Sequence, residues 1–212
     1  MQYKNVRIGL MVILCSEIFN TFLVSIIFTV LLTEDVGVID GITTTILLFV
    51  LLAELIGINI AAKEEAFFKN ARNVVIIAMI QTVVTIILDS TGILTSATAV
   101  SVVNQIFTIM INLFVLRAIR NMYEAHGESV RLVKLASIFC VGFVGLGVLL
   151  QFWGATFLAI SVKNNLVAEI MFFIFILMTL ASNIIYYVVL VKAMRRSKTW
   201  NKDIQGEVEC VK

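Results

Sequence analysis

Six long apolar stretches dominate the sequence and limit what the chain can fold into. Each has about 20 or more mostly apolar residues, the length that a helix needs to cross the hydrocarbon core of a bilayer. They lie at about 8–32, 42–62, 74–94, 97–116, 135–160 and 166–191. The connections between them are short. We therefore predict a single transmembrane domain over residues 1–212, with no soluble domain and with a short polar tail at 192–212.

The composition and the physics of lipid decide the class of fold. Hydrophobic residues make up 60% of the chain and charged residues only 14%, whereas soluble domains carry about a quarter charged residues. Inside a bilayer every backbone N–H and C=O needs a partner, which leaves helices or closed barrels. The apolar runs do not alternate as barrel strands do. The prediction is an all-α integral membrane protein, a six-helix bundle, rather than a soluble, nucleic-acid-binding, disulfide-rich or disordered chain.

The basic residues predict how the bundle is oriented. Of the 16 Lys and Arg residues, all except Lys163 fall at the ends or connections that six alternating spans place on one side. Basic residues are enriched on the cytoplasmic side of membrane proteins. Both termini are therefore expected inside, in the plasma (inner) membrane. The long connection between the fourth and fifth stretches is expected to extend the fourth helix, with Gly127 as the residue that ends it.

Residues for catalysis or for metal binding are scarce. The chain has one histidine, His126, and no motif of a hydrolase, a zinc protease, a nucleotide-binding loop or a dinucleotide fold. The three cysteines, Cys15, Cys140 and Cys210, are interpreted as inert. We expect no catalytic residue, no metal and no cofactor, so an enzyme is the least favoured function.

Two carboxyl groups stand out because of their depth in the membrane. Glu17 and Glu54 lie in the first two stretches. At 1.5 Å rise per residue, each is about 12–14 Å from the cytoplasmic edge of the membrane. A carboxyl at that depth costs on the order of 3 kcal/mol and suggests a function. Their helices are joined by a short loop, so the two groups could share a proton. The simpler alternative is that each only hydrogen-bonds a neighbouring helix.

Other polar side chains follow helical stripes in the later stretches. Asn112 continues a stripe in the fourth stretch, Gln151 lies between glycines in the fifth, and Asn183 and Tyr186 share a face of the sixth. Polar groups in hydrocarbon are expected to turn towards the bundle interior. We predict a ligand or proton site formed by Glu17, Glu54, Asn112, Asn183, Gln151 and Tyr186. Hydrogen bonds between helices would explain the same stripes.

The six spans, the two inside termini and the length of about 200 residues resemble the substrate-binding subunits of energy-coupling-factor vitamin transporters. The resemblance is one of size and topology, and no motif carries residues across. It implies a bundle that binds a small solute. The favoured hypothesis is transport or sensing of a small solute or proton at an internal polar site. The alternative is a non-catalytic accessory or immunity-type membrane protein that binds another membrane protein. Expected partners are the lipid bilayer and either another membrane subunit or a second copy, with no nucleic acid.

Overall fold

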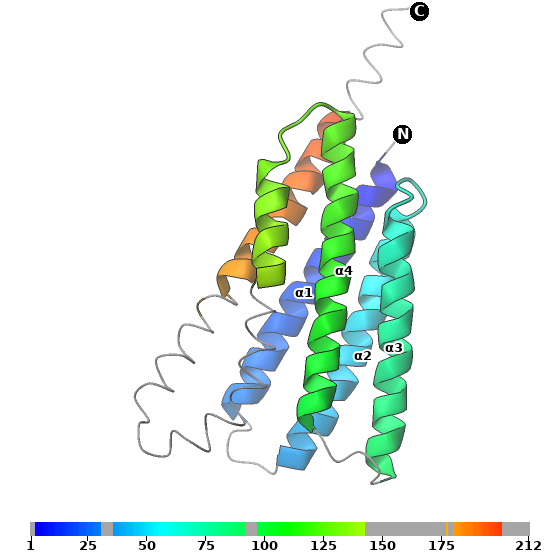
Figure 1. Ribbon diagram of the computed structural model, residues 1–212, viewed down its shortest axis with the longest axis vertical. Coiled ribbons are helices and arrows are strands. Elements are labelled where there is room, and N and C mark those ends of the chain that lie inside the picture. The colour runs from blue at the N-terminus through cyan, green and yellow to red at the C-terminus, as the bar shows by residue number, and fades with distance from the viewer. Residues whose placement is uncertain (1–2, 31–35, 92–96, 143–176, 178–179, 201–212) are drawn as a thin grey trace, which may run out of the picture. The chain divides into compact units, whose positions relative to one another are not determined.

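The computed structural model describes residues 3–30, 36–91, 97–142, 177 and 180–200, and all elements in this part of the chain are helices. The four labelled helices are α1 (Lys4–Val30), α2 (Val36–Ala61), α3 (Phe68–Ser90) and α4 (Ala97–Ala125). Residues 131–142 and 180–200 are helical as well (Figure 1). Three described segments are long and apolar enough to cross a membrane: Lys4–Phe22, Phe68–Leu88 and Val102–Ala125. Thr45–Ala61 of α2 is a shorter apolar helix.

The first four predicted stretches correspond to α1–α4: α1, α2 and α3 begin four to six residues before the predicted starts, and α4 continues from the predicted end at 116 to Ala125. The third stretch is a continuous helix up to Ser90, and its last residues, 92–94, lie outside the described part. Of the last two stretches, residues 143–176 lie outside the described part. The helix that contains the end of the sixth stretch continues beyond 191 to Trp200, into what the sequence suggested was a tail.

The chain divides into two compact units. The first comprises Met1–Thr95 and Leu190–Lys212, and the second Ser96–Val189. The first unit thus holds α1, α2, α3 and the end of the 180–200 helix. The second holds α4, the 131–142 helix and the start of the last helix.

Two glycines bring α1 and α2 into close contact in the first unit. A Cβ on Gly57 would lie 2.8 Å from the carbonyl oxygen of Gly9, and a Cβ on Gly9 would overlap the carbonyl oxygen of Gly57. Only residues without a side chain fit at this crossing, and small residues are what allow apolar helices to pack closely. Because Gly9 is near the start of α1 and Gly57 near the end of α2, the helices are antiparallel. Leu10 and Ile58 are fully buried beside them.

Three segments rich in basic residues meet at one end of this unit. The backbone N–H of Val6, in the first turn of α1, donates to Oε2 of Glu64 in the α2–α3 turn at 2.9 Å. This bond satisfies one of the N–H groups that a helix start leaves without an internal partner. Tyr3 packs edge-on against Trp200, with ring centroids 5.7 Å apart. The start of α1, the α2–α3 turn and the end of the 180–200 helix therefore lie together.

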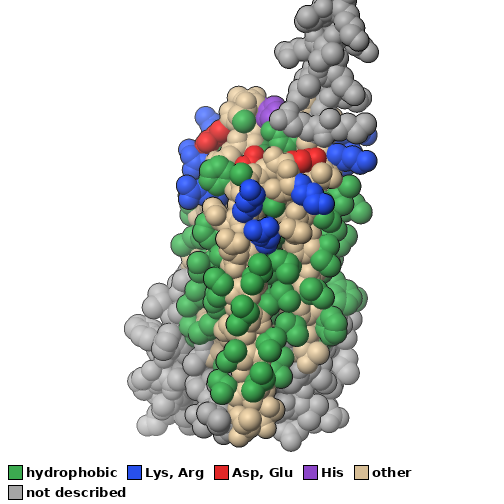
Figure 2. Space-filling view, turned by 90° about the vertical axis from the view of Figure 1, so that its right-hand side faces the viewer, with side chains coloured by type: hydrophobic (Ala, Val, Ile, Leu, Met, Phe, Trp, Pro, Cys, Tyr) green, Lys and Arg blue, Asp and Glu red, His purple; other side chains and the backbone are tan. Residues whose placement is uncertain are grey.

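The surface of α3 is apolar over most of its length. Figure 2 views the described part from the side of α3 and shows hydrophobic side chains along the helix, with Lys and Arg side chains near one end. The exposed large apolar residues of this helix are Ile76, Ile77, Ile80, Val83, Val84, Ile86 and Ile87. Soluble monomers rarely expose a continuous apolar surface of this kind. The pattern fits a helix that faces lipid.

The fourth helix ends as the sequence predicts. Gly127 has a positive φ of 64°, the left-handed conformation that glycine adopts without strain. The N–H of Glu128 donates to the carbonyl of Tyr123 at 2.9 Å, and that of Gly127 to the carbonyl of Glu124 at 3.2 Å. This pair of bonds is the Schellman motif. It ends α4 and lets the chain turn into the 131–142 helix, which lies beside α4 (Figure 1).

Candidate functional site

The side chains of Glu17 and Glu54 are hydrogen-bonded to each other. Glu54 is 5% exposed, one of the few buried charged or polar residues, and Glu17 is half-buried. An ionised carboxylate only accepts hydrogen bonds, so a bond between two carboxyl groups requires a proton on at least one of them. The structure therefore brings together the two acidic residues whose equal depth suggested a pair.

The geometry of antiparallel helices explains why these two side chains meet. Glu17 lies eight residues beyond Gly9 in α1, and Glu54 three residues before Gly57 in α2. At 1.5 Å rise, the two Cα atoms are about 12 and about 4.5 Å from the glycine crossing along the helices, on the same side of it. Side chains on a helix lean towards its N-terminus. In antiparallel helices Glu17 and Glu54 therefore lean towards each other and close the gap between their Cα atoms.

The two helices carry no positive charge near the pair, since the basic residues of α1, Lys4 and Arg7, lie in its first turn. Residues 8–62 contain no Lys, Arg or His, so α1 and α2 themselves have no cation at this depth. The neighbouring Ser16, which is 7% exposed, donates its hydroxyl to the carbonyl of Ile13 at 2.8 Å. In apolar surroundings, a shared proton is the simplest way for two carboxyls to avoid two uncompensated charges.

The other predicted site residues belong to the second unit or lie outside the described residues. Asn112 and Asn183 are half-buried, and Oδ1 of Asn112 is a buried atom that accepts no hydrogen bond from the described part of the chain. Tyr186 is 5% exposed, and its ring lies 6.3 Å from that of Tyr187. Gln151 lies outside the described part. The structure thus joins Glu17 to Glu54 in the first unit, whereas Asn112, Asn183 and Tyr186 belong to the second.

An apolar groove of about 430 Å³ lies along α1 and α2. Its lining includes Ser16 and Ala53, which directly precede Glu17 and Glu54, and the aromatic rings of Phe19 and Phe49. The groove is lined almost entirely by apolar side chains, so it suits a hydrocarbon chain better than a polar solute.

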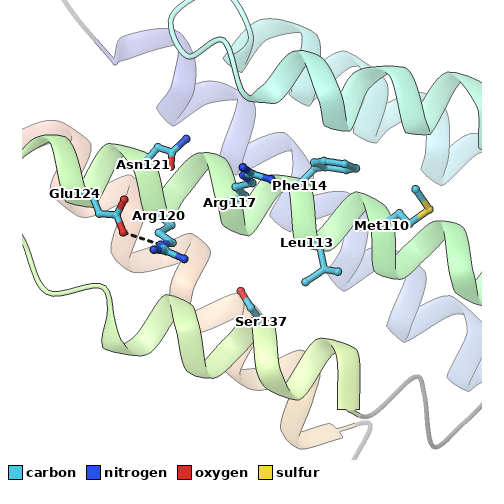
Figure 3. A pocket seen from close by; sticks show the side chains of 8 residues that line it. All are labelled: Met110, Leu113, Phe114, Arg117, Arg120, Asn121, Glu124 and Ser137. Carbon is cyan, nitrogen blue, oxygen red and sulfur yellow. Dashed lines mark hydrogen bonds and ion pairs between the residues drawn. The ribbon is translucent and has the colours of Figure 1, made fainter.

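A second pocket, of about 640 Å³, lies in the second unit between α4 and the 131–142 helix (Figure 3). Sequence reasoning did not select its residues as a site. They are Met110, Leu113, Phe114, Arg117, Arg120, Asn121, Glu124 and Ser137. The signal was present in the sequence, because the α4 members recur at spacings of three and four and thus share one face of the helix. In the sequence alone, Arg117 and Arg120 indicate only the orientation of the chain.

The described residues offer no arrangement for a metal ion, since no group of three or more His, Cys, Asp or Glu side chains comes together there. Cys15 is exposed and Cys140 is buried, and both are free thiols. Comparison of the chain with protein-family models, curated proteins and solved structures gives no match.

Proposed function

We propose that the protein is a six-span protein of the plasma membrane in which Glu17 and Glu54 bind and release a proton during transport or sensing. The hydrogen bond between the two carboxyls carries this proposal. Ionisable groups inside membrane spans commonly form proton relays or substrate sites. The lack of any Lys, Arg or His between residues 8 and 62 favours a bound proton over an internal ion pair.

The proposed orientation has both termini in the cytoplasm. It is supported by the three basic segments that meet at one end of the first unit, because Lys and Arg are concentrated on the cytoplasmic side. Single cysteines at positions 38, 125 and 205 would test the orientation by labelling with a membrane-impermeant thiol reagent. We expect labelling from outside at 38 only. Labelling from outside at 125 or 205 would contradict the topology.

Infrared difference spectroscopy tests the shared proton directly. The purified protein should show the C=O stretching band of a protonated carboxyl, and this band should change between acidic and alkaline buffer. Glu17→Gln and Glu54→Gln should each remove or shift the band, because an amide does not titrate. Ser16→Ala is the matched control, since it removes a buried polar group next to Glu17 but no titratable proton. A spectrum that is the same in all four proteins would refute the pair.

A flux assay then tests whether the proton is used. Liposomes that contain the protein and a pH-sensitive dye are given an inside-negative potassium diffusion potential. Proton entry is then followed with and without candidate solutes. We expect flux in the wild type and in Ser16→Ala, and loss of flux with unchanged folding in both Gln variants. A structural role predicts the reverse, with Gln tolerated and Leu destabilising at either position. That outcome would overturn the proposal.

A further inference from the structure

The pocket between α4 and the 131–142 helix has an apolar half and a cationic half. Met110, Leu113 and Phe114 form the first, and Arg117, Arg120 and Asn121 begin the second (Figure 3). Met110 and Arg117 are seven residues apart, which is about 10 Å along the helix. The cationic half adjoins the polar turn at 126–130, so the apolar half is the one that lies further into the candidate span Val102–Ala125.

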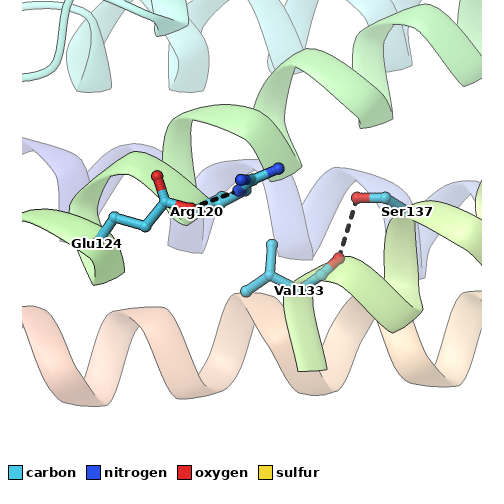
Figure 4. A network of polar contacts seen from close by, with 4 residues as sticks. All are labelled: Arg120, Glu124, Val133 and Ser137. Carbon is cyan, nitrogen blue, oxygen red and sulfur yellow. Dashed lines mark hydrogen bonds and ion pairs between the residues drawn. The ribbon is translucent and has the colours of Figure 1, made fainter. Parts of the chain in front are cut away.

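The cationic half presents donors suited to a phosphate. Arg120 Nε donates to Oε1 of Glu124 at 2.7 Å (Figure 4). This bond orients the guanidinium while using only one of its five N–H groups. Arg117 stands one turn earlier on the same helix, and the amide of Asn121 can donate as well. Arginine's planar fork matches phosphate oxygens and binds them by paired hydrogen bonds.

The local charge favours an anion. Between residues 117 and 137 the chain carries four cationic side chains, Arg117, Arg120, Arg131 and Lys134, against two acidic ones, Glu124 and Glu128. A free phosphate would use only the cationic half of the pocket. A molecule with a phosphate at one end and a hydrocarbon chain at the other would use both halves.

We propose that this pocket binds an anionic phospholipid, with its phosphate at Arg117 and Arg120 and an acyl chain along Met110, Leu113 and Phe114. Basic pockets between membrane helices are known binding places for anionic lipid headgroups. The site would thus hold one lipid at the basic end of α4. It does not depend on the proton pair of the first unit.

Native mass spectrometry of the delipidated full-length protein tests this proposal with three probes: phosphatidylglycerol, phosphatidylcholine and inorganic phosphate. We expect retention of phosphatidylglycerol in preference to phosphatidylcholine. The double variant Arg117→Gln/Arg120→Gln should bind phosphatidylglycerol about tenfold more weakly or worse. Arg195→Gln/Arg196→Gln is the matched control, since it removes the same charge from the first unit, and it should bind like the wild type.

Two further variants separate headgroup from chain and guard against misfolding. Leu113→Asn should weaken phosphatidylglycerol binding, because it places a polar group where the acyl chain would lie. Arg117→Lys/Arg120→Lys keeps the charge and should bind with intermediate affinity. Any of three results would overturn the proposal. They are an equal loss of phosphatidylglycerol binding in both double Gln variants, equal binding of the two lipids, and displacement of phosphatidylglycerol by an equal concentration of inorganic phosphate.

Discussion

Replacement of Gly9 by alanine tests whether the glycine crossing holds α1 and α2 together. The added Cβ would meet Cβ of Ala61 at 2.8 Å, the backbone nitrogen of Ala61 at 2.9 Å and, closer still, the carbonyl oxygen of Gly57. Two of these three atoms belong to the backbone of α2 and cannot rotate away, so the helices must separate. Overpacking costs about 1–3 kcal/mol, and rigid neighbours favour the upper end.

Alanine is a better helix former than glycine by about 1 kcal/mol, which offsets part of this cost. We therefore expect Gly9→Ala to lower the free energy of unfolding by about 2 kcal/mol, which is a factor of about 30 in the folding equilibrium. Gly142→Ala is the matched control, because a Cβ there meets no atom of the described residues within 4 Å and should leave stability equal or slightly higher. Equilibrium unfolding in mixed micelles measures both. If Gly9→Ala is as stable as Gly142→Ala, the crossing does not limit the packing of these helices.

Three smaller predictions concern the ends of the helices. Gly127→Ala should cost about 1–2 kcal/mol in the same unfolding assay, because its φ of 64° strains a residue with a Cβ. Glu64→Ala should cost about 1 kcal/mol through the loss of the acceptor for the N–H of Val6. Glu64→Gln keeps an acceptor and should cost less. If both variants lose the same stability, the negative charge of Glu64, and not its role as acceptor, is what stabilises the fold. Burial, followed by the charges of Glu65 and Glu64, raises the pKa of Tyr3 above its ordinary value of 10.0. The neutral phenol therefore makes its full contribution to the stability of the folded state below pH 10. This contribution is lost as the pH rises through the folded-state pKa. Tyr3→Phe should remove that alkaline component from the pH dependence of unfolding.

The helical class follows from the sequence because the demand for backbone hydrogen bonds in lipid acts on every apolar run. The end of α4 was predictable for a local reason, since Gly127 combines a polar context with the one residue type that adopts a positive φ freely. The continuation of the last helix to Trp200 was not predictable from local signals. The helix reaches Trp200, whose ring contacts that of Tyr3, almost the full length of the chain away in sequence.

The same distinction applies to the sites. The depth of Glu17 and Glu54 could be counted from the sequence, but their contact depends on how each helix is rotated, and periodicity in a uniformly apolar helix leaves that rotation open. The pocket at Arg117 and Arg120 was missed for a different reason. Basic residues at the end of a span are already explained by their enrichment on the cytoplasmic side of the membrane. Only the packing of the 131–142 helix against α4 makes these arginines one wall of a pocket.

The glycine crossing and the acidic pair in the first unit are parts of one arrangement. Close approach at Gly9 and Gly57 sets the distance between α1 and α2, and the lean of side chains towards each N-terminus brings Glu17 and Glu54 together from opposite directions. A larger residue at the crossing would separate the helices, and the two carboxyls would then each have to find another partner or stay protonated alone. Gly9→Ala should therefore change the carboxyl band in the infrared spectrum although it removes no acidic group, and Gly142→Ala should not. A band that is unaltered in Gly9→Ala would mean that the contact between Glu17 and Glu54 is held by something other than the crossing.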